Sequence, residues 1–224
     1  MANRLVCAVL LAVLFSAPAL AGQTKIKNYA TAQSSVFWEK LYPTGGQGVY
    51  CNTLLTKGEG SSIEHAFPAD WIAKSFGCPN RDSCPFAEYG FAEADLHNLW
   101  PAIGNINSSR GKLPLGELPG DTARRFQDIC QDYERSSGKL AVVEPREQSK
   151  GELARSILYM AITYGLSPKG SITQLIQWHK DDPPSDHEKS RNDKIEELQG
   201  TRNPFIDHPE LADTIKVRVT RDAF

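Results

Sequence analysis

The sequence lacks the excess of positive charge that proteins binding nucleic acid usually show. It has 25 Lys and Arg residues against 27 Asp and Glu residues, a net charge of −2 at pH 7. A nucleic-acid-binding domain typically presents a basic patch or stripe, and a negative remainder weakens non-specific binding to a phosphate backbone. The composition therefore excludes a broadly basic surface, and any site for a polyanion must be local.

Long apolar runs are also missing after the first 21 residues. Arg4 precedes an apolar stretch at residues 5–15, and Ala19-Leu20-Ala21 offers a small-residue cleavage site. This is the pattern of a secretory signal peptide, whereas a membrane-spanning helix needs about 20 apolar residues. We therefore predict a signal peptide at residues 1–21 and a single domain at residues 22–224. The domain is expected to be secreted or periplasmic, without a membrane anchor. Loss of Arg4 with the signal peptide would leave 24 basic and 27 acidic residues.

Cysteine is scarce, and its distribution favours disulfides. Loss of Cys7 with the signal peptide would leave four cysteines, at positions 51, 78, 84 and 130. An even number in an exported protein indicates two disulfides, for which three connectivities are possible. We favour Cys78–Cys84, which closes a short loop, and this leaves Cys51–Cys130. The alternative is a zinc site, but Cys-x5-Cys is poor zinc spacing and no His pair lies nearby.

Residue patterns in the first half of the chain are weak. Residues 22–40 read as weakly helical or irregular. Short strands are expected at residues 49–55 and 63–67, the second ended by Pro68, and a helical turn follows to residue 76. Residues 88–101 are expected to be helical, and residues 105–118, which are rich in Asn, Ser, Gly and Pro, are expected to form a loop.

The last third of the chain carries clearer signals. Apolar residues recur at helical spacing between residues 153 and 164, and Gly165 closes that helix. Ser171 and Ser185 each begin a capping-box pattern, and Gly200 ends the second of these helices. Residues 207–210 read as one more helix start. The residues thus predict an α+β fold, a mostly helical single domain with a small β element in its N-terminal half.

Glu64 and His65 are the first candidates for chemistry. A carboxylate is a suitable ligand for Mg²⁺, which prefers oxygen, and a neutral imidazole can accept a proton from water. Adjacent residues of a regular strand point to opposite faces. The two can therefore meet on one phosphate only if the strand ends near His65, which Pro68 makes plausible. Alone, the pair is more simply a surface Glu followed by a packed His.

Other candidates lie further along the chain. The Asn107 carbonyl oxygen is a legitimate metal ligand, although Asn in a Gly- and Ser-rich loop is ordinarily a turn former and Asn107-Ser108-Ser109 is a glycosylation sequon. His97 and Asn98 could support His65 by hydrogen bonding. Arg81 and Arg110 could each face a phosphate, and the simpler interpretation of each is a solvated surface charge.

Taken together, these segments resemble the endonuclease I family of exported bacterial nucleases, which carry the ββα-metal, or His-Me finger, active site. The first matching segment contains Glu64-His65. The second contains His97-Asn98 and the Gly-x-x-Asn pattern that ends at Asn107. The matches follow one another in order and cover most of the chain after the signal peptide. They lie at residues 63–69, 95–110, 144–145 with 150–160, 178–183, and 199–209.

The resemblance implies roles for particular residues. His65 matches the general base that activates water, and Glu64 and Asn107 match the ligands of a metal ion, normally Mg²⁺. Arg81 lies between Cys78 and Cys84, where the family has an Arg that helps to neutralise the phosphate, and we class it with His65 as catalytic. His97 and Asn98 would support the active site.

Further expectations follow from the same resemblance. Arg110 and Arg155 are additional candidates for contact with the substrate phosphate, and the segment from Arg202 to Pro209 has no chemical role that we can derive. The expected function is hydrolysis of DNA with little sequence preference and with 5′-phosphate products, by a monomer with no organic cofactor. The sequence does not decide whether RNA is also a substrate. The alternative is a non-catalytic secreted module that keeps the fold and binds nucleic acid or protein. The intact set Glu64, His65 and Asn107 argues against it.

Overall fold

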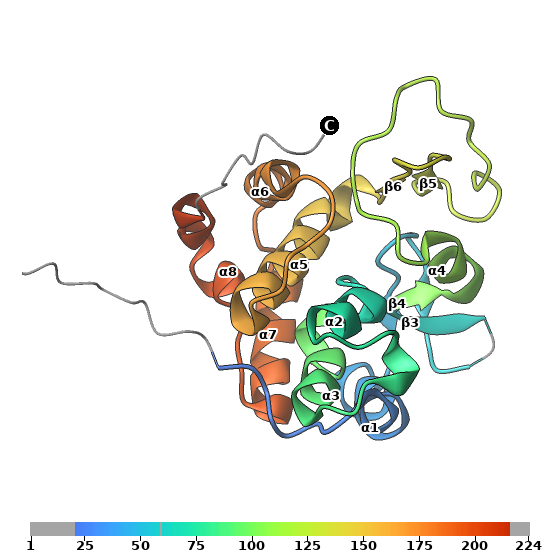
Figure 1. Ribbon diagram of the computed structural model, residues 1–224. Helices are drawn as coiled ribbons and strands as arrows, with labels where there is room; N and C mark the ends of the chain where they lie inside the picture. Colours follow the sequence, from blue (N-terminus) through green and yellow to red (C-terminus); the bar gives the residue numbers. More distant parts are fainter. Residues whose placement is uncertain (1–20, 59, 216–224) are drawn as a thin grey trace, which may run out of the picture.

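Two short strands and one helix form a unit near the middle of the chain. The computed structural model describes residues 21–58 and 60–215, so the predicted signal peptide lies outside the described residues except for Ala21. Strand β3 (Ser61–His65) pairs antiparallel with β4 (Leu99–Ile103), with Ser61 opposite Ile103 and His65 opposite Leu99. Helix α4 (Gly104–Arg110) follows β4 directly, and Figure 1 shows the three elements together.

Strand β3 ends at His65 because the chain is held in a turn there by Asn98. The Ala66 amide donates to the Asn98 carbonyl at 2.9 Å, and the Phe67 amide donates to Asn98 Oδ1 at 2.6 Å. Asn98 Nδ2 in turn donates to the Phe67 carbonyl at 2.9 Å. Pro68 then leads into helix α2 (Ala69–Ser75). The strand expected over residues 63–67 is present but runs from Ser61 to His65, so it ends two residues earlier than predicted, and the predicted helical turn is confirmed.

Helices dominate the rest of the described chain, so the fold class is α+β, as predicted. The N-terminal part has α1 (Tyr29–Thr31), a π-helix η1 (Ala32–Leu41), the strand pair β1 (Gly46–Gln47) and β2 (Leu54–Leu55), a 3₁₀ turn η2 (Arg81–Ser83), α3 (Ala87–Glu93) and a second 3₁₀ turn η3 (Leu96–Asn98). The C-terminal part has the strand pair β5 (Glu134–Arg135) and β6 (Val143–Glu144), η4 (Glu147–Ser149), α5 (Lys150–Tyr164), α6 (Ile172–Asp181), α7 (Asp186–Gln199), α8 (Pro204–Asp207) and η5 (Pro209–Thr214).

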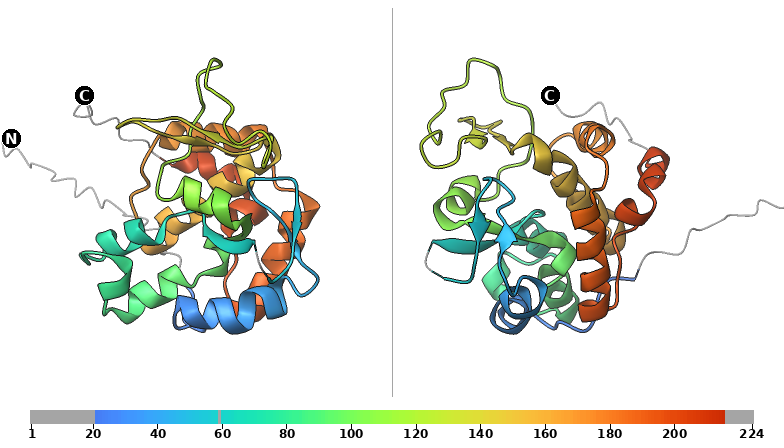
Figure 2. Two further views of the ribbon diagram at one scale, coloured as in Figure 1. Left: turned by 90° about the vertical axis from the view of Figure 1, so that its right-hand side faces the viewer. Right: turned by 180° about the vertical axis from the view of Figure 1, so that it is seen from behind.

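Helix α5 connects the β3–β4 pair to the C-terminal helices. Trp100 Nε1 on β4 donates to Ser156 Oγ on α5 at 2.9 Å, and both residues are buried. Helices α6 and α8 pack against α5, and Figure 1 shows them on the side of α5 away from β3 and β4. The segment between α4 and β5 projects beyond the helices, which the two views of Figure 2 show clearly.

The C-terminal helices begin and end where the sequence predicts. Ser171 accepts a hydrogen bond from the Gln174 amide at the start of α6, and Ser185 and Glu188 form both halves of a capping box on α7. Gly165 and Gly200 end α5 and α7 with φ of +64° and +84°, a left-handed conformation that favours glycine. The start expected near residue 207 is a short 3₁₀ helix, η5.

Three predictions in the first half were wrong. The helix expected over residues 88–101 ends at Glu93, and its last part is strand β4. The loop expected over residues 105–118 begins as helix α4, and only Leu54 and Leu55 of residues 49–55 form a strand. The first two errors have the same cause, because β4 and α4 depend on partners in β3 that are distant in sequence, and tertiary pairing overrides weak local propensity.

Both favoured disulfides are present. Cys78–Cys84 closes the short loop that follows α2, and Cys51–Cys130 joins two segments 79 residues apart. Cys51 and Cys130 lie in the main buried cluster with Tyr50 and Trp100. A second buried cluster packs η1 against the other face of the strand pair, through residues that include Phe37, Ile63 and Leu99. The strand pair is therefore held on both faces.

Candidate active site

The end of β3 opens into a hollow of about 410 Å³. The side chains around it come from α1, β3, α2, η2 and α4 and the residues that follow them. Glu64, His65, Arg81, Asn107 and Arg110 are all among the lining residues. The structure thus brings together five of the residues singled out from the sequence. Because β3 ends at His65, the adjacent Glu64 and His65 border one hollow.

His65 is oriented by a backbone carbonyl. Its Nε2 lies 3.1 Å from the carbonyl oxygen of Glu93, which can only accept, so Nε2 carries the proton and Nδ1 keeps its lone pair. The ring packs against Tyr29, with 4.8 Å between centroids. Burial, with the positive charges of Arg81 and Arg110, lowers the pKa of His65 to about 3, against the opposite effect of the Glu93 carbonyl. The imidazole is therefore neutral at physiological pH, and the Nδ1 lone pair is unprotonated.

Glu64 is buried beside a positive charge. Its Oε1 accepts from the Tyr50 hydroxyl at 2.9 Å and lies 3.0 Å from Arg110 Nη1, whereas Oε2 has no hydrogen-bond partner among the described residues. Burial raises the pKa of Glu64 to about 6, although Arg110 and Tyr50 favour the charged form. At pH 7 about nine tenths of such a group is ionised. Glu64 therefore presents one carboxylate oxygen that is free to bind a cation.

Asn107 is fixed through its amide nitrogen. Nδ2 donates to Ser62 Oγ at 3.0 Å and to the Ile63 carbonyl at 3.1 Å, which ties α4 to β3. With both donors engaged, Oδ1 is left without a hydrogen-bond partner in the described part of the chain. Asn107 and Glu64 thus each contribute one uncommitted oxygen to the same hollow.

Arg81 reaches the hollow from the loop closed by Cys78–Cys84. The Asn80 side chain accepts from the Asp82 and Ser83 amides and so starts the turn that holds Arg81. Arg81 Nη2 lies 2.7 Å from Glu93 Oε1, and the guanidinium lies 5.2 Å from the centre of the Tyr29 ring. The side chain remains 40% exposed. Of the two arginines whose charges lower the pKa of His65, Arg81 is the more accessible.

Arg110 lines the hollow but is committed to the protein. Its side chain is 1% exposed. Nη1 donates to the His65 carbonyl at 3.1 Å and contacts Glu64, and Nη2 donates to the Ala66 carbonyl at 2.8 Å. Because the guanidinium is buried and already bonded to these groups, Arg110 is not placed to contact the substrate phosphate, which was the role expected from the sequence. They make Arg110 a positioning residue that holds Glu64 and the end of β3.

Asn98 and His97 have different surroundings. Asn98 holds the turn after His65, as described above, so it supports the site directly. His97 is fully buried and is not among the residues that line the hollow. Its Nε2 lies 3.1 Å from the Thr201 carbonyl, and its ring packs on Tyr159 with 4.6 Å between centroids. His97 therefore stabilises the contact between η3 and the C-terminal segment.

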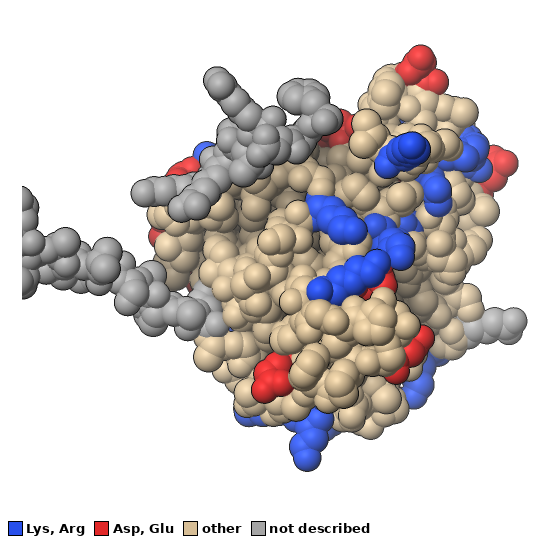
Figure 3. All heavy atoms as spheres, viewed as in Figure 1, with Lys and Arg blue, Asp and Glu red and all other residues tan. Residues whose placement is uncertain are grey.

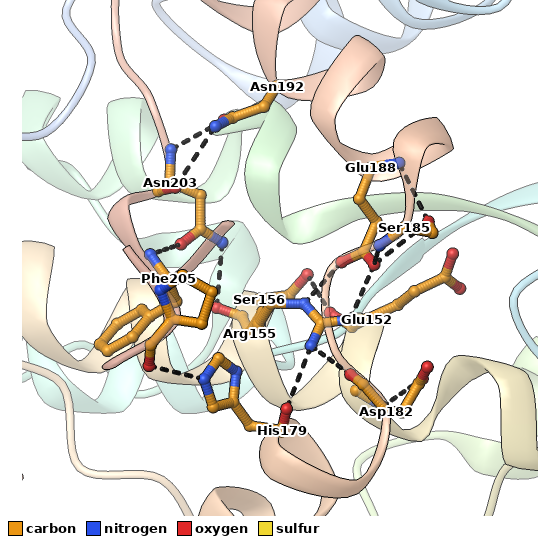
Figure 4. Close-up of polar contacts among 12 residues, drawn as sticks. Glu152, Arg155, Ser156, His179, Asp182, Ser185, Glu188, Asn192, Asn203 and Phe205 are labelled. Carbon is orange, nitrogen blue, oxygen red and sulfur yellow. Dashed lines mark hydrogen bonds and ion pairs between the residues drawn. The ribbon is translucent and has the colours of Figure 1, made fainter. Parts of the chain in front are cut away.

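Arg155 lies outside the site. Its side chain is 1% exposed, with Nε and Nη2 at 2.6 and 2.7 Å from the two oxygens of Glu188 and Nη1 donating to the Asp182 carbonyl at 2.6 Å. Figure 4 shows the guanidinium enclosed by these groups. The phosphate contact expected for Arg155 is corrected on this geometry, because the guanidinium is buried and fully paired.

The segment after Gly200 joins helices to one another. Asn203 accepts from the Phe205 amide at the start of α8, and its Nδ2 donates to the Arg155 carbonyl at 3.1 Å (Figure 4). Its backbone amide donates to Asn192 Oδ1 on α7 at 2.9 Å. Arg202 pairs with Asp207 and with two acidic residues of α7. The sequence match over this segment therefore has a packing explanation.

Several residues that shape the site had no signal in the sequence. Tyr50, which fixes Glu64, lies in a segment expected to be a strand, and Glu93 orients His65 through its backbone carbonyl, an atom that every residue has. Lys112 lines the hollow without belonging to any motif. Only the folded arrangement identifies these groups.

The free oxygens of Glu64 and Asn107 fit a hard divalent cation. Across residues 21–58 and 60–215, no three His, Cys, Asp or Glu side chains converge as a metal site. Mg²⁺ does not require such a cluster, because it keeps several waters and is usually held by one or two protein groups and the phosphates of its substrate. A carboxylate and an amide oxygen meet that need, so the donor set fits the ion expected from the sequence.

Comparison with known proteins places the chain in a family. The family model for Endonuclease I matches residues 23–210. The chain is 31% identical over 180 residues to Endonuclease-1 of Buchnera aphidicola subsp. Baizongia pistaciae, covering 76% of this chain and 72% of the relative. It is 32% identical over 152 residues to a periplasmic deoxyribonuclease of Aeromonas hydrophila, covering 64% of this chain and 62% of the relative.

A third relative is named for action on RNA. The chain is 35% identical over 143 residues to an extracellular ribonuclease of Bacillus amyloliquefaciens, covering 54% of this chain and 46% of the relative, so the match spans less than half of that longer protein. No helix in the described residues is long and apolar enough to cross a membrane. Because the family model spans nearly all of the described residues, the chain belongs to the endonuclease I family.

Proposed function

We propose that this protein is an exported, Mg²⁺-dependent endonuclease that hydrolyses phosphodiester bonds of DNA and also of RNA. Relatives named deoxyribonuclease and ribonuclease both support action on the backbone that the two polymers share. The relatives named periplasmic and extracellular support export. The order strand, strand, helix in β3, β4 and α4 supports assignment of the site to the ββα-metal, or His-Me finger, class.

One observation carries the proposal. His65, whose Nδ1 lone pair is left free by the bond from Nε2 to Glu93, lines the same hollow as Glu64 and Asn107, each of which has one uncommitted side-chain oxygen. A base and a cation-binding pair on one hollow meet two demands of phosphodiester hydrolysis, activation of water and neutralisation of charge. Arg81 adds a positive charge beside them.

The proposed reaction is a single displacement at phosphorus. His65 Nδ1 accepts a proton from water as the water oxygen attacks phosphorus, and the bond between phosphorus and the 3′ oxygen breaks with its electron pair left on oxygen. The 3′ oxygen takes a proton from solvent water, which gives a 5′-phosphate and a 3′-hydroxyl, and His65 then releases its proton to solvent. When bound by Glu64 and Asn107, Mg²⁺ supplies Lewis-acid stabilisation of the phosphate and of charge on the leaving oxygen. Arg110 keeps Glu64 in position, and the Glu93 carbonyl holds the His65 ring through Nε2, which leaves Nδ1 free.

Low sequence specificity follows from the nature of these groups. The candidate base, metal ligands and Arg81 can contact a phosphate, and contacts with phosphate carry no sequence information. We propose that the protein acts as a monomer, because the residues of the site all come from one chain.

The experiment is nicking of a supercoiled plasmid with Mg²⁺, with EDTA, and by matched histidine variants. His65→Ala should slow nicking by at least about 100-fold, the range for loss of a general base. His208→Ala is the control, because His208 is exposed and outside the hollow. Glu64→Gln and Asn107→Ala should raise the Mg²⁺ concentration needed for half-maximal rate. Absence of nicking by the wild type, or equal nicking by His65→Ala, would refute the proposal, and binding of DNA without nicking would favour the non-catalytic alternative.

A further inference from the structure

Two lysines converge on one carboxylate beside the proposed active site. Asp70 Oδ2 on α2 lies 3.1 Å from Lys74 Nζ and 3.1 Å from Lys112 Nζ. The lysine side chains are 49% and 62% exposed, whereas Asp70 is 23% exposed. Burial alone would raise the pKa of Asp70, but hydrogen bonds from Lys112 and Lys74 hold it below its usual value, so the carboxylate is ionised. One negative charge thus faces two positive ones.

A third lysine extends this group. Lys169, in the loop between α5 and α6, lies with its Nζ 5.4 Å from the centre of the Trp71 ring, and Trp71 follows Asp70 directly on α2. Figure 3 shows Lys and Arg side chains gathered in the middle of this face, with an acidic group among them. We name Lys74, Lys112 and Lys169 the lysine ridge. With Asp70 they carry a net charge of +2.

The lysine ridge is a local excess of positive charge in a chain with a net charge of −2. By contrast, three lysines on α6 and α7 are each paired with one carboxylate: Lys180 with Asp213, Lys189 with Asp186, and Lys194 with Glu197. Their side chains are 46% to 56% exposed, much like the ridge lysines. The lysine ridge is therefore the kind of local basic patch that the overall composition requires of a polyanion-binding site.

The lysine ridge begins at the active-site hollow and leaves it on one side. Lys112 lines the hollow together with His65 and Asn107. Asn107 also lines a second hollow of about 640 Å³, whose one lining lysine, Lys57, is paired with Glu39 at 2.6 Å. The lysine of the second hollow thus has a carboxylate of its own, whereas Lys112 shares Asp70 with Lys74.

We propose that the lysine ridge binds backbone phosphates on one flank of the scissile bond and supplies much of the affinity for nucleic acid. This inference rests on the proposed function, because it concerns the substrate of the same site. The contacts are electrostatic and independent of base sequence. Each lysine that neutralises a phosphate releases condensed counterions, so its loss must lower the salt dependence of binding as well as the affinity.

The test measures binding of a short labelled DNA duplex by fluorescence anisotropy. A His65→Ala background, with EDTA present, prevents cleavage during the measurement. The triple variant Lys74→Gln, Lys112→Gln, Lys169→Gln should bind about 10- to 100-fold more weakly near 0.1 M salt. The slope of log association constant against log salt concentration is negative, and its magnitude should decrease by about 2 to 3. The control triple variant Lys180→Gln, Lys189→Gln, Lys194→Gln makes the same change in net charge and should stay within about twofold.

Two further variants separate charge from folding. A triple Lys→Arg variant of the lysine ridge keeps the charge and should keep the salt slope. Asp70→Asn removes the one neutralising carboxylate and should tighten binding. Equal losses in the ridge and control variants, an unchanged slope in the ridge variant, or weaker binding by Asp70→Asn would overturn the inference. Nicking by the wild-type protein is measured separately from binding by the variants. Failure of the proposal for the lysine ridge is therefore distinguishable from failure of the nuclease proposal.

Discussion

Replacing Arg155 with Met should destabilise the fold without weakening contact with substrate. The Arg155 and Glu188 side chains are 1% and 2% exposed, and they meet through two contacts of 2.6 and 2.7 Å. Loss of the guanidinium leaves a buried carboxylate whose remaining donors come from Ser185. Breaking a buried ion pair in this way costs about 3–5 kcal/mol. In a domain of this size 1 kcal/mol moves Tm by about 2–4 °C, so we expect a fall on the order of 10 °C.

A double-mutant cycle tests the origin of that loss. Glu188→Gln removes the negative charge but keeps an amide that suits the capping box at the start of α7. The double variant buries neither unpaired charge, so it should lose about 2–3 kcal/mol less than the sum of the single variants. Thermal unfolding followed by circular dichroism, with the disulfides intact, gives the stabilities. The nicking rate per folded molecule should stay within about twofold of wild type.

One result would refute this assignment of Arg155. If Arg155→Met left Tm unchanged but weakened DNA binding and lowered its salt slope, the guanidinium would be contacting phosphate, as the sequence suggested. The burial of Arg155 and its pairing with Glu188 predict the opposite pattern.

Two more predictions concern stability. Burial lowers the pKa of His97 from an ordinary 6.5 to about 4. The folded state therefore favours the neutral imidazole, and this contribution to stability is present above pH 6.5 and is lost as the pH falls toward 4. The loss amounts to at most roughly 3 kcal/mol of unfolding free energy. His97→Gln should therefore flatten the fall of unfolding free energy over that window in urea titrations while leaving nicking per folded molecule nearly unchanged, and an unaltered pH profile would contradict this. Removing Cys51–Cys130, which spans 79 residues, should cost about 4 kcal/mol, and removing Cys78–Cys84, which spans 6, about 2 kcal/mol, by the chain entropy of the unfolded state. The two double Cys→Ala variants, one for each disulfide, are compared by urea unfolding. A larger loss of unfolding free energy on removal of Cys78–Cys84 than on removal of Cys51–Cys130 would contradict this prediction.

The elements that the sequence predicted well are those whose signals are local. Ser185 and Glu188 cap α7, and Gly200 ends it, because each acts on backbone groups within one helical turn. Pro68 predicted the end of β3 only to within two residues, because it excludes strand pairing beyond residue 67, whereas the turn held by Asn98 ends the strand at His65. The disulfides followed from an even number of cysteines and one short spacing.

Strand β4 and helix α4 could not be predicted in the same way. Residues 99–103 form a strand because they pair with β3, 38 residues earlier in the chain. Helix α4 has the sequence Gly-Asn-Ile-Asn-Ser-Ser-Arg, whose residues favour turns, and it is held by contacts of Asn107 and Arg110 with β3. Both elements depend on pairing and contacts across the fold.

For the site, the sequence by itself determined which chemical groups are present: a base in His65, oxygen ligands in Glu64 and Asn107, and arginines that could meet a phosphate. Only the tertiary structure decided what each arginine does. Arg81 stays accessible at the hollow, Arg110 is buried against Glu64, and Arg155 is buried against Glu188. The three residues have the same side chain, and the sequence does not distinguish them. Burial and pairing with a carboxylate determine whether a guanidinium can contact a substrate, and both depend on the packing of segments that are distant in the sequence.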